Sequence, residues 1–184
     1  VDTTKCEGTG TFFEITATNA LGYQWQVNSG SGYADLSDGG VYSGSGTNKL
    51  TISDVTGMNG YKFRCVAGGL CSPDATSNEK TLTVLSGVNI TSSPGNLNKC
   101  YGESALFSVV ASGSSLTYKW QEYDGSGWND LANGGVYSGV TTDELSISNV
   151  DGLDGMKYRC IVSNSCGSDT SGEALLRVGL TAPS

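Results

Sequence analysis

The sequence predicts an all-β protein made of two tandem antiparallel β-sandwiches. Three observations carry this prediction. Apolar and polar residues alternate with a period of two, glycine-rich turns separate the alternating runs, and the first half of the chain returns in the second half. Short strands at regular spacing, with turn signals between them, are typical of sandwiches and barrels.

The alternation is clear in both halves. Phe13, Ile15 and Ala17 alternate with polar residues in the first half, and Phe107 and Val109 do so in the second. A period of two places every other side chain on one face of a strand, so each run predicts a strand with one face in the core. Turn-forming stretches separate the runs at residues 28–32, 37–40, 124–127 and 133–135.

The repeat marks two copies of one module. The segment DLSDGGVYSG at residues 35–44 returns as DLANGGVYSG at residues 130–139, and KFRC at 62–65 returns as KYRC at 157–160. An offset of 95 positions, from Trp25 to Trp120, is the size of a whole sandwich domain. We therefore predict a first domain at residues 1–86 and a second at 87–184.

The two copies differ at their starts. Residues 88–94 form the expected first strand of the second domain, and nothing equivalent precedes Cys6 in the first. The first domain is therefore expected to be truncated at its opening strand.

Composition argues against several functions. The chain has 10 Lys and Arg against 18 Asp and Glu, a formal net charge of -8, and no histidine. Clustered basic residues for a phosphate backbone are missing, so no nucleic acid partner is expected. No stretch reaches the ~20 apolar residues of a membrane span, so no membrane insertion is expected. Without histidine there is no Ser-His-Asp arrangement, and we predict that the chain is not an enzyme.

Several residues resemble landmarks of the immunoglobulin fold. Trp25 and Trp120 occupy the place of its strand C tryptophan, and Phe63 and Tyr158 begin the Tyr-x-Cys pattern of its strand F. With the Cys-x-Gly, Gly-Gly-Val-Tyr-Ser-Gly and Tyr-Arg-Cys stretches, the chain is similar to bacterial Ig-like repeat modules of large secreted or surface proteins, of the adhesin type, from Bacteroidota. The resemblance implies a secreted or cell-surface, extracellular location.

Two departures from that fold stand out. The strand B position of the usual bridging cysteine is Ile15 in one copy and Val109 in the other, so aliphatic packing is expected in place of the inter-sheet disulfide. The tyrosine-corner position is Tyr158 in the second copy and Phe63 in the first, which lacks the hydroxyl.

Each copy has three cysteines: Cys6, Cys65 and Cys71, then Cys100, Cys160 and Cys166. Six cysteines allow 15 connectivities. Cys65 and Cys160 are expected in the core beside Trp25 and Trp120. Strand placement puts the first and third cysteine of a module at opposite ends of the sandwich, too far apart for a bridge. Two alternatives remain: a bridge between modules, such as Cys6 to Cys166, or a first region of the module that is folded differently from the immunoglobulin pattern.

The family resemblance implies a different pairing. Similar repeats often hold the first and third cysteine without the middle one, which implies Cys6 with Cys71 and Cys100 with Cys166. We favour this pairing, with Cys6, Cys71, Cys100 and Cys166 as disulfide candidates. Because no Cys-x-x-Cys pair, histidine or calcium-loop pattern occurs, no metal site and no cofactor are predicted.

One aromatic group is a candidate ligand platform. Trp128 follows a glycine-rich turn, and with Tyr123 and Tyr137 it offers flat rings beside Asp and Asn, as sugar stacking requires. The structural alternative is that these rings cover the sheet, and repetition of aromatics at Tyr33 and Tyr42 favours it.

Two functional hypotheses follow. The first is a non-catalytic structural or adhesive repeat pair of a larger secreted or cell-surface protein, acting as a spacer and as a protein- or surface-interaction module. The second is a carbohydrate-binding accessory module of a secreted polysaccharide-degrading enzyme. The expected partners are an unidentified protein or glycan ligand and the neighbouring modules of the parent chain.

Overall fold

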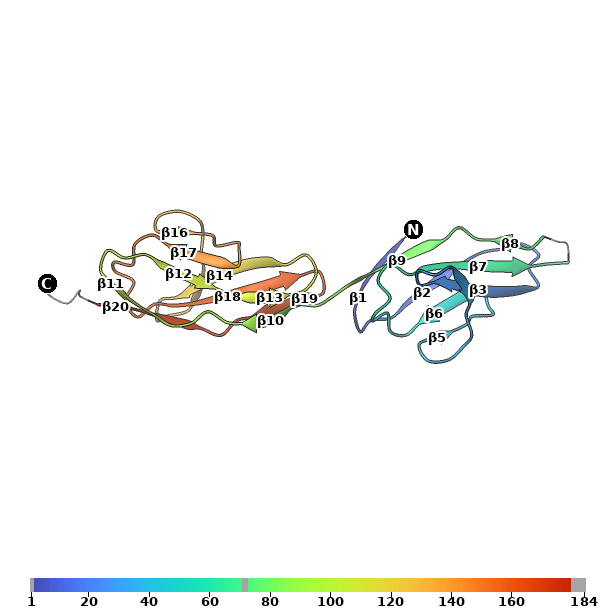
Figure 1. Cartoon of the computed structure of the whole chain (residues 1–184), viewed down its shortest axis with the longest axis horizontal. Helices are drawn as coiled ribbons and strands as arrows, with labels where there is room; N and C mark the ends of the chain where they lie inside the picture. Colours follow the sequence, from blue (N-terminus) through green and yellow to red (C-terminus); the bar gives the residue numbers. More distant parts are fainter. Residues whose placement is uncertain (1, 71–72, 180–184) are drawn as a thin grey trace. The chain divides into compact units, whose positions relative to one another are not determined.

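The protein was analysed as a computed structural model that describes residues 2–70 and 73–179 (Figure 1). It divides into two compact units, residues 1–86 and 87–184. Every regular element in the described part of the chain is a β-strand. The described residues therefore include no helix that is long and apolar enough to cross a membrane.

Unit 1 consists of two sheets. Its strands are β1 (Thr3–Cys6), β2 (Thr11–Glu14), β3 (Gly22–Asn28), β4 (Tyr33–Asp35), β5 (Tyr42–Ser43), β6 (Lys49–Ile52), β7 (Lys62–Gly68), β8 (Ala75–Thr76) and β9 (Lys80–Leu85). One sheet has the order β1-β9-β7-β3-β4, with β8 also paired to β7, and the other has the order β2-β6-β5. The pair β1–β9 is parallel, whereas the other pairs in this unit are antiparallel.

Unit 2 repeats this arrangement and adds one strand pair. Its strands are β10 (Asn89–Ser92), β11 (Leu97–Cys100), β12 (Ala105–Ser108), β13 (Val110–Ser112), β14 (Thr117–Tyr123), β15 (Trp128–Asp130), β16 (Tyr137–Ser138), β17 (Glu144–Ile147), β18 (Lys157–Asn164), β19 (Gly167–Thr170) and β20 (Ala174–Gly179). The sheets have the orders β11-β20-β18-β14-β15, with β19 on β18, and β12-β17-β16. The additional pair is β10-β13.

The core of each unit lies between its two sheets. In β7, burial alternates along the strand, so that Phe63, Cys65 and Ala67 are buried while their neighbours are partly exposed. Leu50 and Ile52 of β6 face them from the other sheet and are completely buried. The residues with the period-two pattern therefore form strands with one buried face. This confirms the predicted all-β fold of two tandem sandwiches.

A tight loop before β6 explains the most similar stretch of the repeat. Gly44 has φ +79°, and a Cβ there would collide with the carbonyl oxygen of Lys49. Gly139 has φ +74° and stands in the same relation to Glu144. Only glycine combines a left-handed backbone with this close approach, so both copies need glycine at this position.

Candidate functional site

The two repeated tryptophans are internal. Trp25 is 1% exposed and Trp120 is 0% exposed. The indole N–H of Trp25 donates to the carbonyl of Thr47 at 2.9 Å, and that of Trp120 donates to the carbonyl of Thr142 at 2.9 Å. Both rings are thus packed and hydrogen-bonded within their units, which leaves them no face for a ligand.

The middle cysteine of each copy lies against its tryptophan. Cys65 pairs across the strands with Trp25, and Cys160 pairs with Trp120. Both thiols are completely buried. This burial raises the pKa of the Cys65 thiol and raises the pKa of the Cys160 thiol to about 11. Since the thiolate is the nucleophile and the metal ligand, these two cysteines act as packing residues.

One disulfide of the favoured prediction is not formed. Cys6 and Cys166 each take part in a disulfide bond. Free thiols are found at Cys65, Cys100 and Cys160. Cys71, which was also a disulfide candidate, lies outside the described residues. The pairing of Cys100 with Cys166 is therefore not formed.

Strand geometry explains why that pairing fails. Cys100 pairs with Gly179 at the end of β20, whereas Cys166 lies in the turn between β18 and β19. β20 meets β18 at the opposite end of β18, where Leu175 pairs with Lys157. The length of β18 therefore separates the two cysteines by about 20 Å, at ~3.3 Å per residue. Bonded cysteines need Cα atoms within about 7 Å.

The candidate platform is only partly assembled. Tyr123 and Trp128 lie together on neighbouring strands, with ring centroids 5.5 Å apart. The guanidinium of Arg159 covers the Trp128 ring at 4.0 Å, and the ammonium of Lys157 lies 5.9 Å from the Tyr123 ring. A cation–π contact of this kind occupies one face of the ring, so a sugar could stack on that face only by displacing the cation.

Tyr137 does not join these two rings. Its hydroxyl donates to Glu122 at 2.6 Å and shares a hydrogen bond of 3.2 Å with the hydroxyl of Tyr158. It packs against the core of unit 2. Burial, followed by the hydrogen bonds to Glu122 and Tyr158, raises the pKa of Tyr137 well above its ordinary value. Burial also raises the pKa of Tyr158 to about 12.

The same positions in unit 1 are less polar. The counterparts of Glu122, Tyr137 and Tyr158 are Val27, Tyr42 and Phe63. The hydroxyl of Tyr42 contacts the Met58 sulfur at 3.7 Å. The two copies therefore close the same edge of the core in two ways, one with a carboxylate and paired hydroxyls and the other with apolar side chains.

An outward-facing hydrogen-bonded ladder was missed by the sequence analysis. In unit 2, Arg159 donates to Gln121 at 2.8 Å, and Gln121 donates to Asp130 at 2.6 Å. The Gln121 bond, followed by one from Lys119, lowers the pKa of Asp130. Unit 1 repeats this ladder with Arg64, Gln26 and Asp35 at 2.7 Å for each bond. The sequence does contain a signal for this ladder, because its three residue types are identical in the two copies.

The aromatic partner of this ladder is also repeated. In unit 1 the guanidinium of Arg64 lies 3.7 Å from the Tyr33 ring, as that of Arg159 lies over Trp128 in unit 2. The Tyr33 hydroxyl donates to Glu79 at 2.6 Å, and Glu79 also pairs with Lys62 at 2.7 Å. In each unit, therefore, the arginine of the ladder packs against one aromatic ring on the surface.

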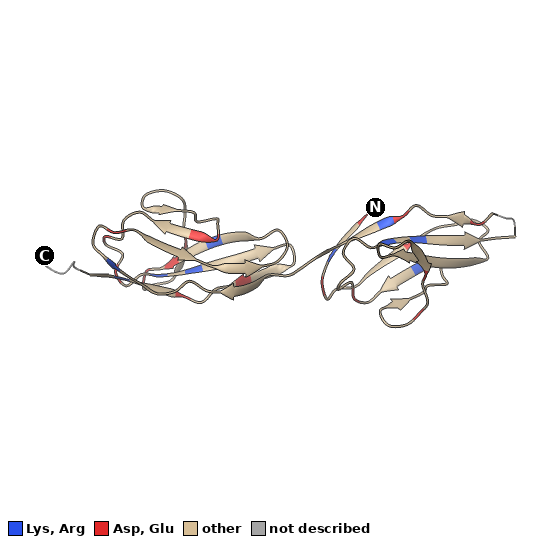
Figure 2. Cartoon of the chain, viewed as in Figure 1, with Lys and Arg blue, Asp and Glu red and all other residues tan. Residues whose placement is uncertain are grey.

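Basic residues are spread over strands of both units (Figure 2), and the acidic residues form no metal-binding group in the described part of the chain. Figure 2 shows Lys and Arg in short separate segments on strands of both units. Among the described residues, no group of three or more Cys, Asp or Glu is placed to hold a metal ion.

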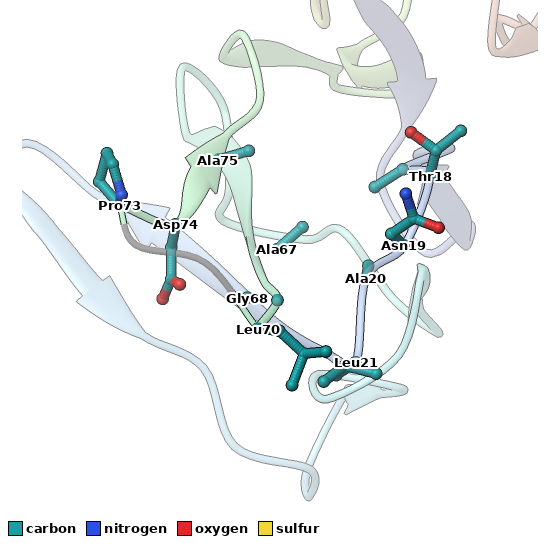
Figure 3. Close-up of a pocket in the computed structure, with 12 residues that line it drawn as sticks. Thr18, Asn19, Ala20, Leu21, Ala67, Gly68, Leu70, Pro73, Asp74 and Ala75 are labelled. Carbon is teal, nitrogen blue, oxygen red and sulfur yellow. The ribbon is translucent and has the colours of Figure 1, made fainter.

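Unit 1 contains a hollow in its surface. It has a volume of about 620 Å³ and lies between the segment around Ala17 and Leu21 and the segment around Ala67 and Asp74 (Figure 3). Leu21 and Leu70, at its rim, are 70% and 91% exposed. The lining contains one carboxylate, Asp74, and is otherwise made of small, apolar and neutral polar residues.

The comparisons agree with this architecture. The family model for the immunoglobulin I-set domain matches residues 88–178, within unit 2. Solved structures with the same fold include a titin fragment of domains I67–I69, with a TM-score of 0.71, 16% identity, and 97% of this chain matched to 62% of that chain. Immunoglobulin domains 1–4 of Sidekick-1 match with a TM-score of 0.69 and 18% identity over 96% of this chain and 46% of that chain. The protein is thus a pair of tandem immunoglobulin-like domains.

A bacterial relative was also found. Endoglucanase C of Cellulomonas fimi is 33% identical over 95 residues, which is 51% of this chain. The match spans 8% of that protein. The similarity therefore concerns one module-sized stretch of a much longer enzyme. A bacterial Ig-like relative is shown, whereas an origin in Bacteroidota adhesins stays a prediction.

Cysteine reactivity should follow burial. In the native, oxidised protein, N-ethylmaleimide at pH 7.5 should label half-buried Cys100 within minutes and leave Cys65 and Cys160 unlabelled until denaturant is added, because Cys100 is the accessible one of the three free thiols in the described residues. Peptide mapping by mass spectrometry reads the three sites separately. Cys100→Ser should remove the fast site alone, and equal labelling of Cys160 and Cys100 in the native protein would contradict the structure.

Alkaline pH should destabilise unit 2 through Tyr158. Its pKa is raised from 10.0 to about 12, so its contribution to folding is complete below pH 10 and is lost as the pH rises through 12. In Tyr158→Phe, the loss of stability between pH 8 and pH 11.5 should be smaller, while stability at pH 8 falls by about 1 kcal/mol. Hydrogen exchange of unit 2 amides in denaturant measures both. An unchanged pH dependence would show that Tyr158 ionises freely in the folded state.

Proposed function

We propose that this pair is a non-catalytic spacer and interaction module of a larger extracellular protein, either secreted or held at the cell surface. The observation that supports this is the repeated ladder of Arg, Gln and Asp on the outer face of each unit, which satisfies its own hydrogen bonds. Both units carry this face with the same three residue types, and its polar groups bond to one another. Such a face is better suited to a stable structural surface than to a reaction site.

The titratable groups support a non-catalytic role. Catalytic acids, bases and nucleophiles have a pKa adapted to proton or group transfer, and they are found in clefts. Here the lowered values belong to acids bound to neighbouring groups of the scaffold. Asp38, Asp54 and Asp124, the last with a pKa of about 2, accept from Ser45, Thr56 and Ser126 in turns. Glu79 and Asp130 accept from side chains of neighbouring strands.

The disulfide bonds formed by Cys6 and by Cys166 support an extracellular location for the protein. Disulfides persist in oxidising compartments and are rare where thiols are kept reduced. The partners in this proposal are neighbouring modules of the same chain and a protein or glycan ligand on another surface. Neither nucleic acid nor membrane insertion is part of the proposal, since the chain carries a net charge of -8.

A second candidate is a carbohydrate-binding accessory module of a polysaccharide-degrading enzyme. The observation in its favour is the 33% identity to a stretch of Endoglucanase C. The aromatic pair of Tyr123 and Trp128 supplies the surface that such a module would use. Against it stands the Arg159 guanidinium over Trp128, which a sugar would have to displace.

The spacer proposal is tested by exchange within the larger protein. Replacing residues 1–184 by an unrelated pair of immunoglobulin-like domains of equal length should restore the surface attachment or reach that deletion of these residues abolishes, because a spacer contributes length and stability. Loss of attachment in the exchanged protein, with normal expression, would assign a specific adhesive contact to this pair instead.

The carbohydrate candidate is tested with the intact chain. Binding to insoluble cellulose and to soluble β-glucans should be absent up to millimolar sugar, and Trp128→Ala should change nothing, because Arg159 already covers the ring. Tyr33→Ala in unit 1 is the matched control, since Tyr33 holds the same relation to Arg64. Saturable binding that Trp128→Ala weakens at least tenfold, and Tyr33→Ala does not, would establish the second candidate.

A further inference from the structure

Two turns of the module contain Asn-Gly in one copy and Asp-Gly in the other. In the first turn, Asn-Gly at residues 59–60 of unit 1 corresponds to Asp-Gly at residues 154–155 of unit 2. In the second turn the order is reversed, because Asn-Gly at residues 133–134 of unit 2 corresponds to Asp-Gly at residues 38–39 of unit 1. Each turn is therefore seen once with a side-chain amide and once with the matching carboxylate.

In the first turn, which leads into β7 and β18, the amide and the carboxylate make the same hydrogen bond. The side-chain oxygen of Asn59 accepts the N–H of Val84 at 2.9 Å. The carboxylate of Asp154 accepts the N–H of Val178 at 2.8 Å. Val84 and Val178 hold the same position in β9 and β20. The module thus keeps this bond with either side chain.

The second turn, which leads into β5 and β16, shows the same exchange. The side-chain oxygen of Asn133 accepts the N–H of Val140 at 3.2 Å, and the carboxylate of Asp38 accepts the N–H of Ser45 at 2.7 Å. Hydrogen bonds from the side chain and the backbone of Ser45 hold the pKa of Asp38 below its ordinary value. An ionised carboxylate is therefore compatible with this turn.

The glycine that follows the acceptor is required by the backbone. Gly60 has φ +83° and Gly134 has φ +138°, and their counterparts Gly155 and Gly39 have φ +81° and +139°. Glycine adopts such angles without steric cost. Asn and Asp are the side chains that most readily accept hydrogen bonds in turns. The fold therefore favours Asn-Gly or Asp-Gly at both places.

An Asn-Gly pair can modify itself in water. The backbone nitrogen of the glycine attacks the side-chain carbonyl carbon of the asparagine, a cyclic imide forms, and the amide nitrogen leaves as ammonia together with the proton of the glycine nitrogen. Solvent water then opens the imide to aspartate or isoaspartate. Glycine has no Cβ to obstruct the ring closure. The side chain thereby gains a negative charge, and water is the co-reactant.

Hydrogen bonds of the folded chain restrain this reaction to different degrees, because the glycine N–H must be released before its nitrogen attacks. The N–H of Gly60 donates at 2.8 Å to the carbonyl of Leu82 in β9, a strand that is paired on both sides. The N–H of Gly134 donates at 2.9 Å to the carbonyl of Tyr137, three residues further along the same turn. Release of Gly134 therefore needs a local opening of one turn, whereas release of Gly60 needs separation of the turn from the sheet.

We propose that Asn133 is a deamidation site of the folded protein and that unit 2 accepts the aspartate product without rearrangement. Asp38 supports the second half of the proposal, since it occupies the same turn as a carboxylate. Isoaspartate lengthens the main chain and breaks the hydrogen bonds of the turn, so aspartate is the product that fits the fold.

Asn59 is the protected counterpart of this site, and it converts when unit 1 unfolds. Conversion of Asn133 adds a negative charge to the surface of a chain whose formal net charge is -8. This chemistry goes beyond the spacer role and holds whether or not that role does.

The first test follows the conversion in the intact chain. The protein is incubated at mildly alkaline pH with and without guanidinium chloride, and the peptides that contain Asn59 and Asn133 are compared by chromatography and mass spectrometry. The two sites should convert at equal rates in denaturant. In the native protein Asn133 should convert about tenfold faster than Asn59, because its turn opens locally. Conversion of Asn133 that is no faster than that of Asn59 in the native protein would overturn the proposal.

The second test examines whether the product fits. Asn133→Asp should keep the melting temperature of unit 2 within about 1 °C of the parent, whereas Asn133→Ala should lower it by about 4 °C, because the N–H of Val140 then lacks its acceptor. Asp38→Asn is the matched control in unit 1, and it should leave the melting temperature of that unit unchanged. If Asn133→Asp lowers the melting temperature as far as Asn133→Ala does, the turn does not accept the carboxylate and the proposal is wrong.

Discussion

The buried tryptophan of each unit fixes the rest of the sandwich. The backbone N–H of Trp25 donates to Ser45 at 2.9 Å, its carbonyl accepts from Leu36 at 2.9 Å, and its indole donates to Thr47 at 2.9 Å. Trp120 makes the corresponding bonds with Val140, Leu131 and Thr142. The backbone and the side chain of one residue thus hold the loop before β6 against the core, and this loop must turn at a glycine. The most similar stretch of the repeat, residues 35–44 and 130–139, is thus held by the tryptophan. Because the polar groups of the tryptophan bond within the unit, we interpret this stretch as structural and not as a ligand site.

Local patterns predicted the fold, whereas long-range pairing decided the sites. Alternation along residues 13–17 and turns rich in glycine depend on neighbours in sequence, so strands and domains followed from them. The position of Cys100 relative to Cys166 depends on how β20 runs along β18, and no spacing in the sequence carries that information. Tyr137 was grouped with Trp128 for the same reason: proximity in sequence did not reveal that its hydroxyl turns toward Tyr158.

The ladder of Arg159, Gln121 and Asp130 shows where a repeat adds information. Each of the three lies on a different strand, and in the sequence each is an ordinary polar residue with nothing to connect it to the others. Their recurrence as Arg64, Gln26 and Asp35 shows that the set belongs together, since the copies differ at many other exposed positions. Comparison of the copies also identifies the change from Val27 and Phe63 to Glu122 and Tyr158. A half-buried carboxylate at this edge is stabilised by hydroxyl partners, and an apolar edge needs none, which is consistent with the joint difference at these positions.

The additional strand pair of unit 2 is stabilised by two contributions that one segment supplies together. Burial of Val88 and Ile90 offsets the free energy of ordering the β10 segment, and pairing with β13 satisfies the backbone groups of the strand edge. An edge strand that buried apolar side chains without pairing would leave its backbone groups exposed, and one that paired without apolar side chains would leave the core uncovered. The alternation of apolar and polar residues along a strand allows both, because side chains and backbone hydrogen bonds point in different directions.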